Sequence, residues 1–198
     1  MRRKIILETT KNIWNMLNKR LLPEDFEMSR YSINARLVQV EDSEFIVRLR
    51  TDSSLSKYLH ATDSDVNKQK DWIQEYKKRE NSGKDYYFLF SWGDKKLGVS
   101  RIYNIDGTKA TGGSWVCDPT NLMEHTIATL LLARDIFFEV LEFPVEEFQV
   151  SKGNNQVLKL HQRMGAEIVE EKEDEYELIL KKNNYLKGRE KLIKLLRL

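Results

Sequence analysis

The segment from Gln149 to Ala166, QVSKGNNQVLKLHQRMGA, places an imidazole where it can take part in proton transfer. An asparagine turn precedes a run with helical spacing, and Gly165 ends it, because asparagine favours the start of a helix and glycine its end. Four side chains share one stripe of this helix: Val157, Leu160, His161 and Met164. His161 therefore points inward, where it either bonds to a main-chain carbonyl or exchanges a proton with a bound molecule.

This segment resembles the last conserved block of the GCN5-related N-acetyltransferases (GNATs), in which a strand ends at an asparagine and a helix runs to a glycine eleven residues later. Asn154 and Gly165 have that spacing. In many members the position of His161 holds a tyrosine whose hydroxyl protonates the departing thiolate of coenzyme A. The resemblance implies that His161 is the general acid, since an imidazole titrates near neutrality and donates from either nitrogen. The alternative is a core histidine bonded to a carbonyl.

The resemblance also implies a binding place for acetyl coenzyme A. In this fold the strand before the long helix diverges from the strand after it, and the pantetheine arm bonds to backbone groups in the opening. Val116, Cys117 and Asn154 are the expected contacts with that arm. The pyrophosphate is expected at the amino end of the long helix, bound by Thr126 and by the backbone N–H groups of His125 and Ile127.

The loop before this helix departs from the family pattern. Most GNATs have a basic, glycine-rich loop here, whereas this chain has no glycine between Ser114 and Gly153 and carries Asp118 and Glu124. Weaker binding of coenzyme A than is usual in the family is therefore expected. The alternative is that Asn121 and Glu124 form a capping box and that no anion binds there.

The acceptor amine is expected to meet the thioester between two strands and a loop. His60, Arg101, Tyr103 and Trp115 are the expected substrate contacts, and Trp115 either stacks on a sugar or nucleotide ring or fills the core. His60 and Asp63 form one candidate pair of base and orienting acid, and Asp118 and Glu124 are weaker candidates for the base. No residue is singled out as the base by its sequence context.

The hydrophobic periodicity predicts the elements that position these residues. Expected strands are 36–40, 86–92, 96–105, 111–117, 147–151, 167–171 and 176–181, and expected helices are 41–49, 65–81, 122–141 and the one that ends at Gly165. That order is the order of the GNAT fold. We therefore expect an α/β (α+β) GNAT domain over residues 31–182, with a mixed, mostly antiparallel sheet flanked by helices on both faces.

Composition and charge limit the possible classes of protein. The chain has 198 residues, a hydrophobic content of 40%, one cysteine and no apolar run of membrane-spanning length, so we expect a cytoplasmic protein without disulfides, zinc sites or a transmembrane segment. The net charge is +2, and because residues 1–30 contribute +3 and residues 181–198 contribute +6, the middle carries −7. An acidic body argues against nucleic acid as a partner.

Both basic ends have helical periodicity. Residues 1–30 are expected as a helical extension and residues 183–198 as a basic amphipathic helix, which pack on the acidic body or on a second subunit in a homodimer. A weaker alternative is contact with an anionic membrane surface.

The substrate prediction comes from the closest branch of the resemblance, the acetyltransferases of bacterial polysaccharide genes. That branch shares the segments 101–105, 113–115 and 157–166 and acetylates an amino group on a nucleotide-linked deoxysugar. One alternative is acetylation of protein amino termini, which the acidic middle favours because it suits a cationic amine. Another is a non-catalytic module that keeps the fold and binds a ligand or a partner.

Overall fold

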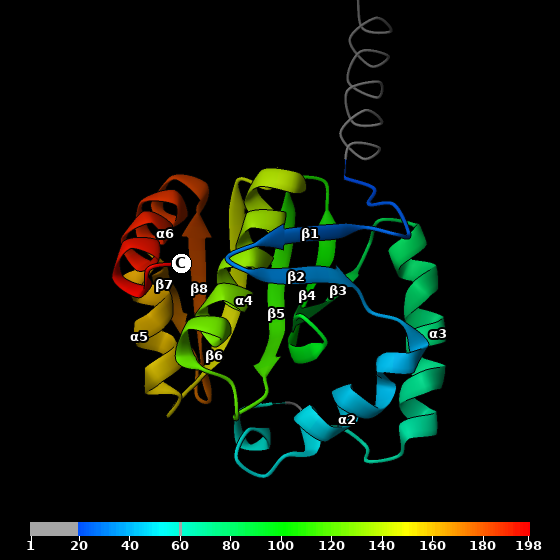
Figure 1. The fold of residues 1–198 in the computed structure, drawn as a ribbon. Coiled ribbons are helices and arrows are strands. Elements are labelled where there is room, and N and C mark those ends of the chain that lie inside the picture. Colours follow the sequence, from blue (N-terminus) through cyan, green and yellow to red (C-terminus); the bar gives the residue numbers. More distant parts are fainter. Residues whose placement is uncertain (1–19, 60) are drawn as a thin grey trace, which may run out of the picture.

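One sheet organises the chain. The computed structural model describes residues 20–59 and 61–198, so most of the expected N-terminal helix lies outside the described residues. Eight strands of the described part form the sheet in the order β1-β2-β3-β4-β5-β6-β8-β7 (Figure 1). Neighbours are antiparallel except β5 and β6, which run parallel. The strands are β1 Glu27–Arg30, β2 Ile33–Leu37, β3 Tyr86–Trp92, β4 Lys95–Asp106, β5 Lys109–Cys117, β6 Val145–Ser151, β7 Glu167–Glu171 and β8 Glu175–Lys181.

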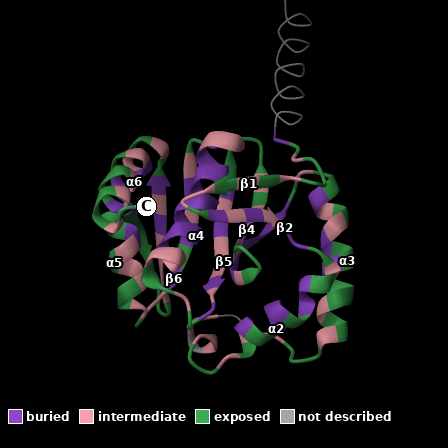
Figure 2. Ribbon diagram, viewed as in Figure 1, coloured by how far each residue is buried: buried purple, intermediate pink, exposed green. Residues whose placement is uncertain are grey.

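Helices cover both faces of this sheet, because alternate side chains of a strand point to opposite faces. Tyr87 and Leu89 of β3 pack under α2 and α3, whereas Phe88 and Phe90 pack under α4, with α6 in the same core. The helices are η1 Val40–Asp42, α2 Ser43–Thr51, η2 Ser56–Tyr58, α3 Val66–Asn81, α4 Met123–Asp135, η3 Ile136–Val140, α5 Asn155–Arg163 and α6 Lys182–Leu196. The sides of α3, α5 and α6 that face away from the sheet carry exposed residues (Figure 2). The predicted fold class is confirmed.

The sheet opens between its two parallel strands. β5 and β6 pair only at Ala110–Glu146 and Thr111–Glu147. Beyond Thr111, β5 continues beside β4 to Cys117, while β6 continues beside β8 to Ser151. The two strands therefore diverge toward their carboxyl ends, and their facing backbone groups have no strand partner there.

A bulge in β5 accompanies this divergence. The register with β4 shifts between Val99 and Arg101, so that two residues of β5, Ser114 and Trp115, stand opposite Ser100. Ser114 has a φ of 51°, a left-handed conformation that is uncommon outside glycine. The bulge changes which way the β5 side chains face at the point where the sheet opens.

The C-terminal helix is part of this body. Gly188 of α6 lies so close to α5 that an added Cβ would come within 2.5 Å of the Met164 carbonyl oxygen. A polar network also joins α6 to α4 and to the β1–β2 turn. Its members are Arg30, Tyr31, Asp135, Glu139, Tyr185 and Arg189. The basic helix 183–198 therefore packs on acidic residues of the body.

Three expected elements are corrected by the structure. The strand expected at 36–40 lies at 33–37, and β1 occupies the end of the segment expected to be a helical extension. The sequence misses this hairpin because Tyr31 and Ser32 form its turn with φ of 57° and 60°, without the asparagine or glycine that usually marks such a turn. The helix expected at 122–141 is α at 123–135 and then a π-turn at 136–140.

Candidate active site

A cavity of about 710 Å³ fills the opening between β5 and β6. Its walls come from residues 112–117 of β5, 148–151 of β6, the inner sides of α4 and α5, and the loop before α3. The unpaired backbone groups of the two strands line it in extended conformation, so the cavity can bind an extended ligand by adding it as a strand between them. We call this cavity the cleft.

The first turn of α4 reaches the cleft through Thr126, which is one of the residues lining it. Leu122 is the N-cap and provides no side-chain hydrogen bond, so the expected capping box of Asn121 and Glu124 does not form. Thr126 N–H donates to Leu122 O within the first turn, which leaves the N–H groups of Met123, Glu124 and His125 as the helix-end donors. The prediction that the backbone of His125 faces an anion fits this arrangement, whereas the N–H groups of Thr126 and Ile127 belong to the helix.

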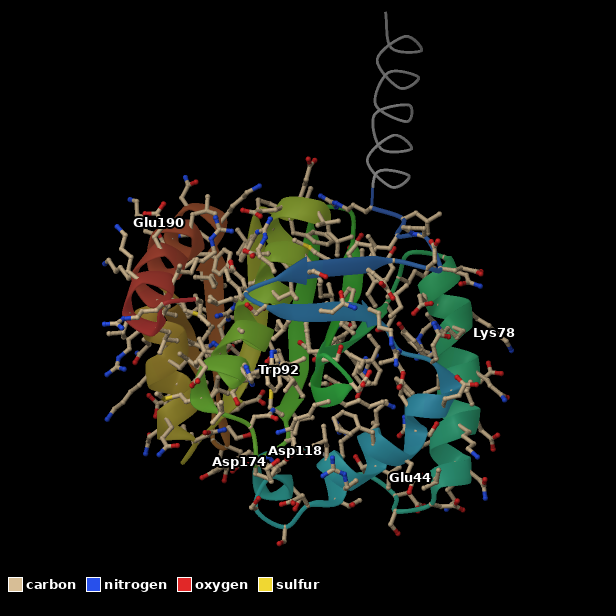
Figure 3. The ribbon with its side chains drawn as sticks, in the orientation of Figure 1. Glu44, Lys78, Trp92, Asp118, Asp174 and Glu190 are labelled. Carbon is tan, nitrogen blue, oxygen red and sulfur yellow. The ribbon has the colours of Figure 1, made fainter. Side chains whose placement is uncertain are left out.

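Asp118 does not point its charge at these donors. It follows β5 directly (Figure 3), and its carboxylate accepts from Thr120 N, from Thr120 Oγ1 and from Arg48 at 2.7 Å. Burial alone would raise the pKa of Asp118, but these bonds lower it to about 2. Asp118 is thus an anion already neutralised by Arg48.

His161 lies against the inner wall of the cleft. Its ring is 6% exposed and packs on the rings of Phe148 and Trp115, with centroids 4.7 and 6.4 Å away. Nδ1 is enclosed and has no hydrogen-bond partner among the described residues. Burial, helped by the charge of Arg134, lowers the pKa of His161 well below its usual value. His161 therefore titrates below the neutral range of a free imidazole and is neutral at pH 7.

The alternative for His161, a bond to a carbonyl, is absent from the described part as well. No carbonyl accepts from the ring, and Trp115 Nε1 donates to Thr129 Oγ1 instead of to His161. Within residues 20–59 and 61–198, the contacts shown for the ring are its packing on Phe148 and Trp115.

Sequence reasoning missed a buried ion pair in the same wall. Arg134 Nε of α4 donates to Glu146 Oε2 of β6 at 2.8 Å, and the two side chains are 2% and 8% exposed. Both residues line the cleft. The available signal was a charged residue inside an otherwise apolar run, TLLLAR, and β6 gave no signal for its partner.

The other expected cofactor contacts lie in the cleft with different roles for their side chains. Val116 turns its side chain into the core under α2 and α3, so only its backbone is offered. Cys117 Sγ contacts Thr129 Oγ1 at 3.2 Å, and burial raises the pKa of this thiol to about 12, so it is not a nucleophile at pH 7. Asn154 is the N-cap of α5 by position, but its side chain makes no capping bond. Its amide is therefore left for other partners.

A second cavity of about 500 Å³ adjoins the cleft on the face covered by α2 and α3. Arg101 and Ser114 line both cavities, so the β5 bulge lies at their junction. The other charged and aromatic residues lining the second cavity are Arg50, Asp63, Lys68, Trp72, Tyr87 and Tyr103.

The residues expected to bind the substrate lie in two different cavities. Arg101, Tyr103 and Asp63 come together in the second cavity, whereas Trp115 lies in the cleft beside His161. Lys68 contacts Asp63 at 2.5 Å and thereby lowers the pKa of this carboxylate, which makes it a weaker base. His60 lies outside the described residues. Among the described residues, no group of His, Cys, Asp and Glu could hold a metal ion, and no helix is long and apolar enough to cross a bilayer.

No protein-family model matches the sequence, and no protein of curated function matches it. The fold is similar to that of apo FdhC, described as a nucleotide-linked sugar GNAT, with 30% identity and a TM-score of 0.77 over 87% of this chain and 99% of FdhC.

Two more distant structures have the same fold. The spermidine N-acetyltransferase of Vibrio cholerae, in complex with CoA and spermine, shares 17% identity with a TM-score of 0.67 over 79% of this chain and 99% of its own. The ribosomal-protein-S5-alanine acetyltransferase of Vibrio fischeri shares 13% identity with a TM-score of 0.70 over 81% and 99%. Their likeness concerns the fold alone.

Proposed function

The chain belongs to the GCN5-related N-acetyltransferase superfamily, and from this premise we propose that it transfers an acetyl group from acetyl coenzyme A to an amino group on a nucleotide-linked deoxysugar. Family membership supports the reaction class, N-acetyl transfer by an enzyme. The choice of a nucleotide-linked sugar as acceptor is supported by one observation: the second cavity is lined by cations and joins the cleft.

The cleft fits acetyl coenzyme A, which supplies the acetyl group as an activated thioester. The backbone of β5 beyond Thr111 and of β6 beyond Glu147 suits the amide-bearing pantetheine arm. The N–H groups of Met123, Glu124 and His125 suit the pyrophosphate, since the amino end of a helix attracts anions. Asp118 leaves these donors free because it bonds to Thr120 and Arg48.

The second cavity suits an anionic acceptor. Arg50, Lys68 and Arg101 bring three cations to it, of which Lys68 is paired with Asp63 and Arg101 with the buried Asp85, so these five groups leave a balance of one positive charge. Asp85 Oδ2 accepts from Arg101 Nη2 at 2.5 Å. The Arg101 guanidinium lies over the ring of Trp72, with Cζ 5.0 Å from the ring centroid. A nucleotide diphosphate complements this charge, whereas a polyamine or a cationic peptide does not. The net charge of −7 over the middle of the chain is therefore a poor guide to the cavity itself.

The two cavities meet at Ser114, so an amine held in the second cavity reaches a thioester held in the cleft at the bulge. His161 contributes as a neutral hydrogen-bond donor toward the departing sulfur, because its lowered pKa excludes an imidazolium at pH 7. His161→Phe keeps the ring packing and removes the donor. It should lower kcat by roughly a hundredfold with little change in KM, and His161→Tyr should keep much of the activity.

The acceptor is tested by a panel offered to the wild-type protein with acetyl coenzyme A. The panel holds nucleotide-linked amino sugars, spermidine, and a peptide with an amino-terminal alanine, and acetylated product is measured by mass spectrometry. Acetylation of a nucleotide sugar alone supports the proposal. Lys68→Gln should then raise KM for that acceptor, because it removes one of the cations lining the cavity.

Two outcomes contradict this proposal. Turnover of spermidine or the peptide in preference to every nucleotide sugar would transfer the function to a cationic amine. Binding of coenzyme A without turnover of any amine in the panel would favour a non-catalytic module.

A further inference from the structure

The Arg134–Glu146 pair closes the inner end of the cleft. Glu146 belongs to the last paired residues before β5 and β6 diverge, and Arg134 reaches it from α4. Gly112 of β5 makes room for this carboxylate, since a Cβ at that position would overlap it. The guanidinium is also fixed from a second side, because Nη1 contacts Met164 Sδ at 2.6 Å.

Packing alone does not explain an ion pair at this place. Burying two charges sacrifices their hydration, and apolar residues of similar volume commonly replace such a pair without loss of stability. Arg134 nevertheless lines the cleft, and its Nη2 is the one guanidinium nitrogen that no described residue engages. The pair therefore presents a fixed cation to whatever occupies the inner end of the cleft.

The position of Arg134 along α4 identifies that occupant. Eleven residues separate Met123 from Arg134, which corresponds to about 16 Å at 1.5 Å per residue. An extended pantetheine arm is of comparable length. With the pyrophosphate at the amino end of α4, the sulfur of coenzyme A comes to the level of Arg134, where His161 also lies.

We propose that Arg134 stabilises the negative charge that develops on the sulfur of coenzyme A, and that Glu146 is the positioning residue that holds Arg134. This role rests on the proposed use of acetyl coenzyme A but not on the identity of the acceptor. As the new N–C bond forms, the C–S bond breaks and its electron pair leaves on the sulfur. The acceptor nitrogen loses its proton to water. The sulfur then takes up a proton from water, so that coenzyme A leaves as the thiol.

None of the other groups named below offers an available positive charge to the sulfur. Cys117 on β5 and His161 on α5 are neutral at pH 7, because burial raises the pKa of the thiol to about 12 and lowers that of the imidazole. Glu146 on β6 is an opposing anion that accepts from Nε, on the same edge of the guanidinium as one Nη2 hydrogen, so the other Nη2 hydrogen is the one left for the sulfur. Arg101 on β4 is bound to Asp85.

The test is the thiol pKa of bound coenzyme A, followed by the ultraviolet absorbance of its thiolate, with desulfo-coenzyme A as the reference. Bound to the wild-type protein, the thiol should titrate about 1 unit or more below free coenzyme A, as thiols beside cations do. The double variant Arg134→Met/Glu146→Leu removes the cation without leaving an unpaired charge, and should reverse this shift. Glu146→Gln removes the opposing charge and should not raise the pKa.

Kinetics give a second readout. The double variant should lose about a hundredfold in kcat at a similar free energy of unfolding, since a lost donor at a developing anion has an effect of this size. Lys109→Met/Glu147→Leu is the matched control, because it removes an exposed ion pair, 3.0 Å long, between β5 and β6, the strands that border the cleft. It should leave the thiol pKa and kcat unchanged.

Two results would overturn the role of Arg134. One is an unshifted thiol pKa for coenzyme A that is demonstrably bound, and the other is wild-type kcat in the Arg134→Met/Glu146→Leu variant. Failure of coenzyme A to bind at all, measured by calorimetry, instead defeats the proposed function.

Discussion

Acidification should lower the free energy of unfolding of this protein, in part because His161 is buried as a neutral imidazole. The variant His161→Phe should lack the part of this decrease that comes from His161. In the unfolded chain the imidazole takes up a proton near pH 6.5. In the folded protein burial holds the pKa of His161 well below that value. Between the two pKa values the unfolded state binds one more proton than the folded state, so the free energy of unfolding falls as the pH falls.

The magnitude follows from that single proton. The loss attributable to His161 approaches about 1.4 kcal/mol for each pH unit below 6.5, down to the folded pKa, and it vanishes above about pH 7. Phenylalanine has a similar ring, keeps the contacts with Phe148 and Trp115, and removes the enclosed Nδ1 that has no partner. The variant should therefore fold, and its stability should depend less on pH.

The assay is urea denaturation of both proteins between about pH 5 and pH 8, with the difference in free energy of unfolding plotted against pH. This difference should be flat above pH 7 and should grow in favour of His161→Phe below pH 6.5. Two parallel curves over the whole range would refute the assignment of His161 as a buried neutral imidazole.

Three further predictions test the packing and the cleft. Gly188→Ala should destabilise the protein by about 1–3 kcal/mol in thermal unfolding, although alanine normally favours a helix, because the added Cβ meets the Met164 backbone; an unchanged or higher Tm would contradict that close approach. Asn154→Ala should weaken coenzyme A binding in calorimetry with little effect on stability, since its side chain makes no capping bond, while Asn155→Ala should leave the affinity nearly unchanged; equal affinities in wild type and Asn154→Ala would remove Asn154 from the cofactor site. Ser114→Gly should raise the free energy of unfolding by about 1 kcal/mol, because glycine adopts a φ of 51° without strain; a loss of stability in urea would show that the Ser114 side chain stabilises the bulge.

The sequence by itself determined the fold and the position of the cleft-forming elements. The strands expected at 86–92 and 167–171 matched β3 and β7 residue for residue, and the apolar run of 86–92, followed by Gly93-Asp94, is typical of a strand buried on both faces. The Asn154 to Gly165 block located α5 and brought His161 to the cleft wall. These signals are local, so one segment contains all the information they need.

The tertiary structure alone decided the electrostatics of the site. The neutrality of His161 depends on rings from β5 and β6 and on the charge of Arg134, none of which is close to it in the sequence. The Arg134–Glu146 pair joins a helix to a strand, and the cations of the second cavity come from α2, α3 and β4. A pKa or an ion pair is set by dehydration and by neighbours in space, and it is the folding of the sheet around the β5–β6 opening that creates both.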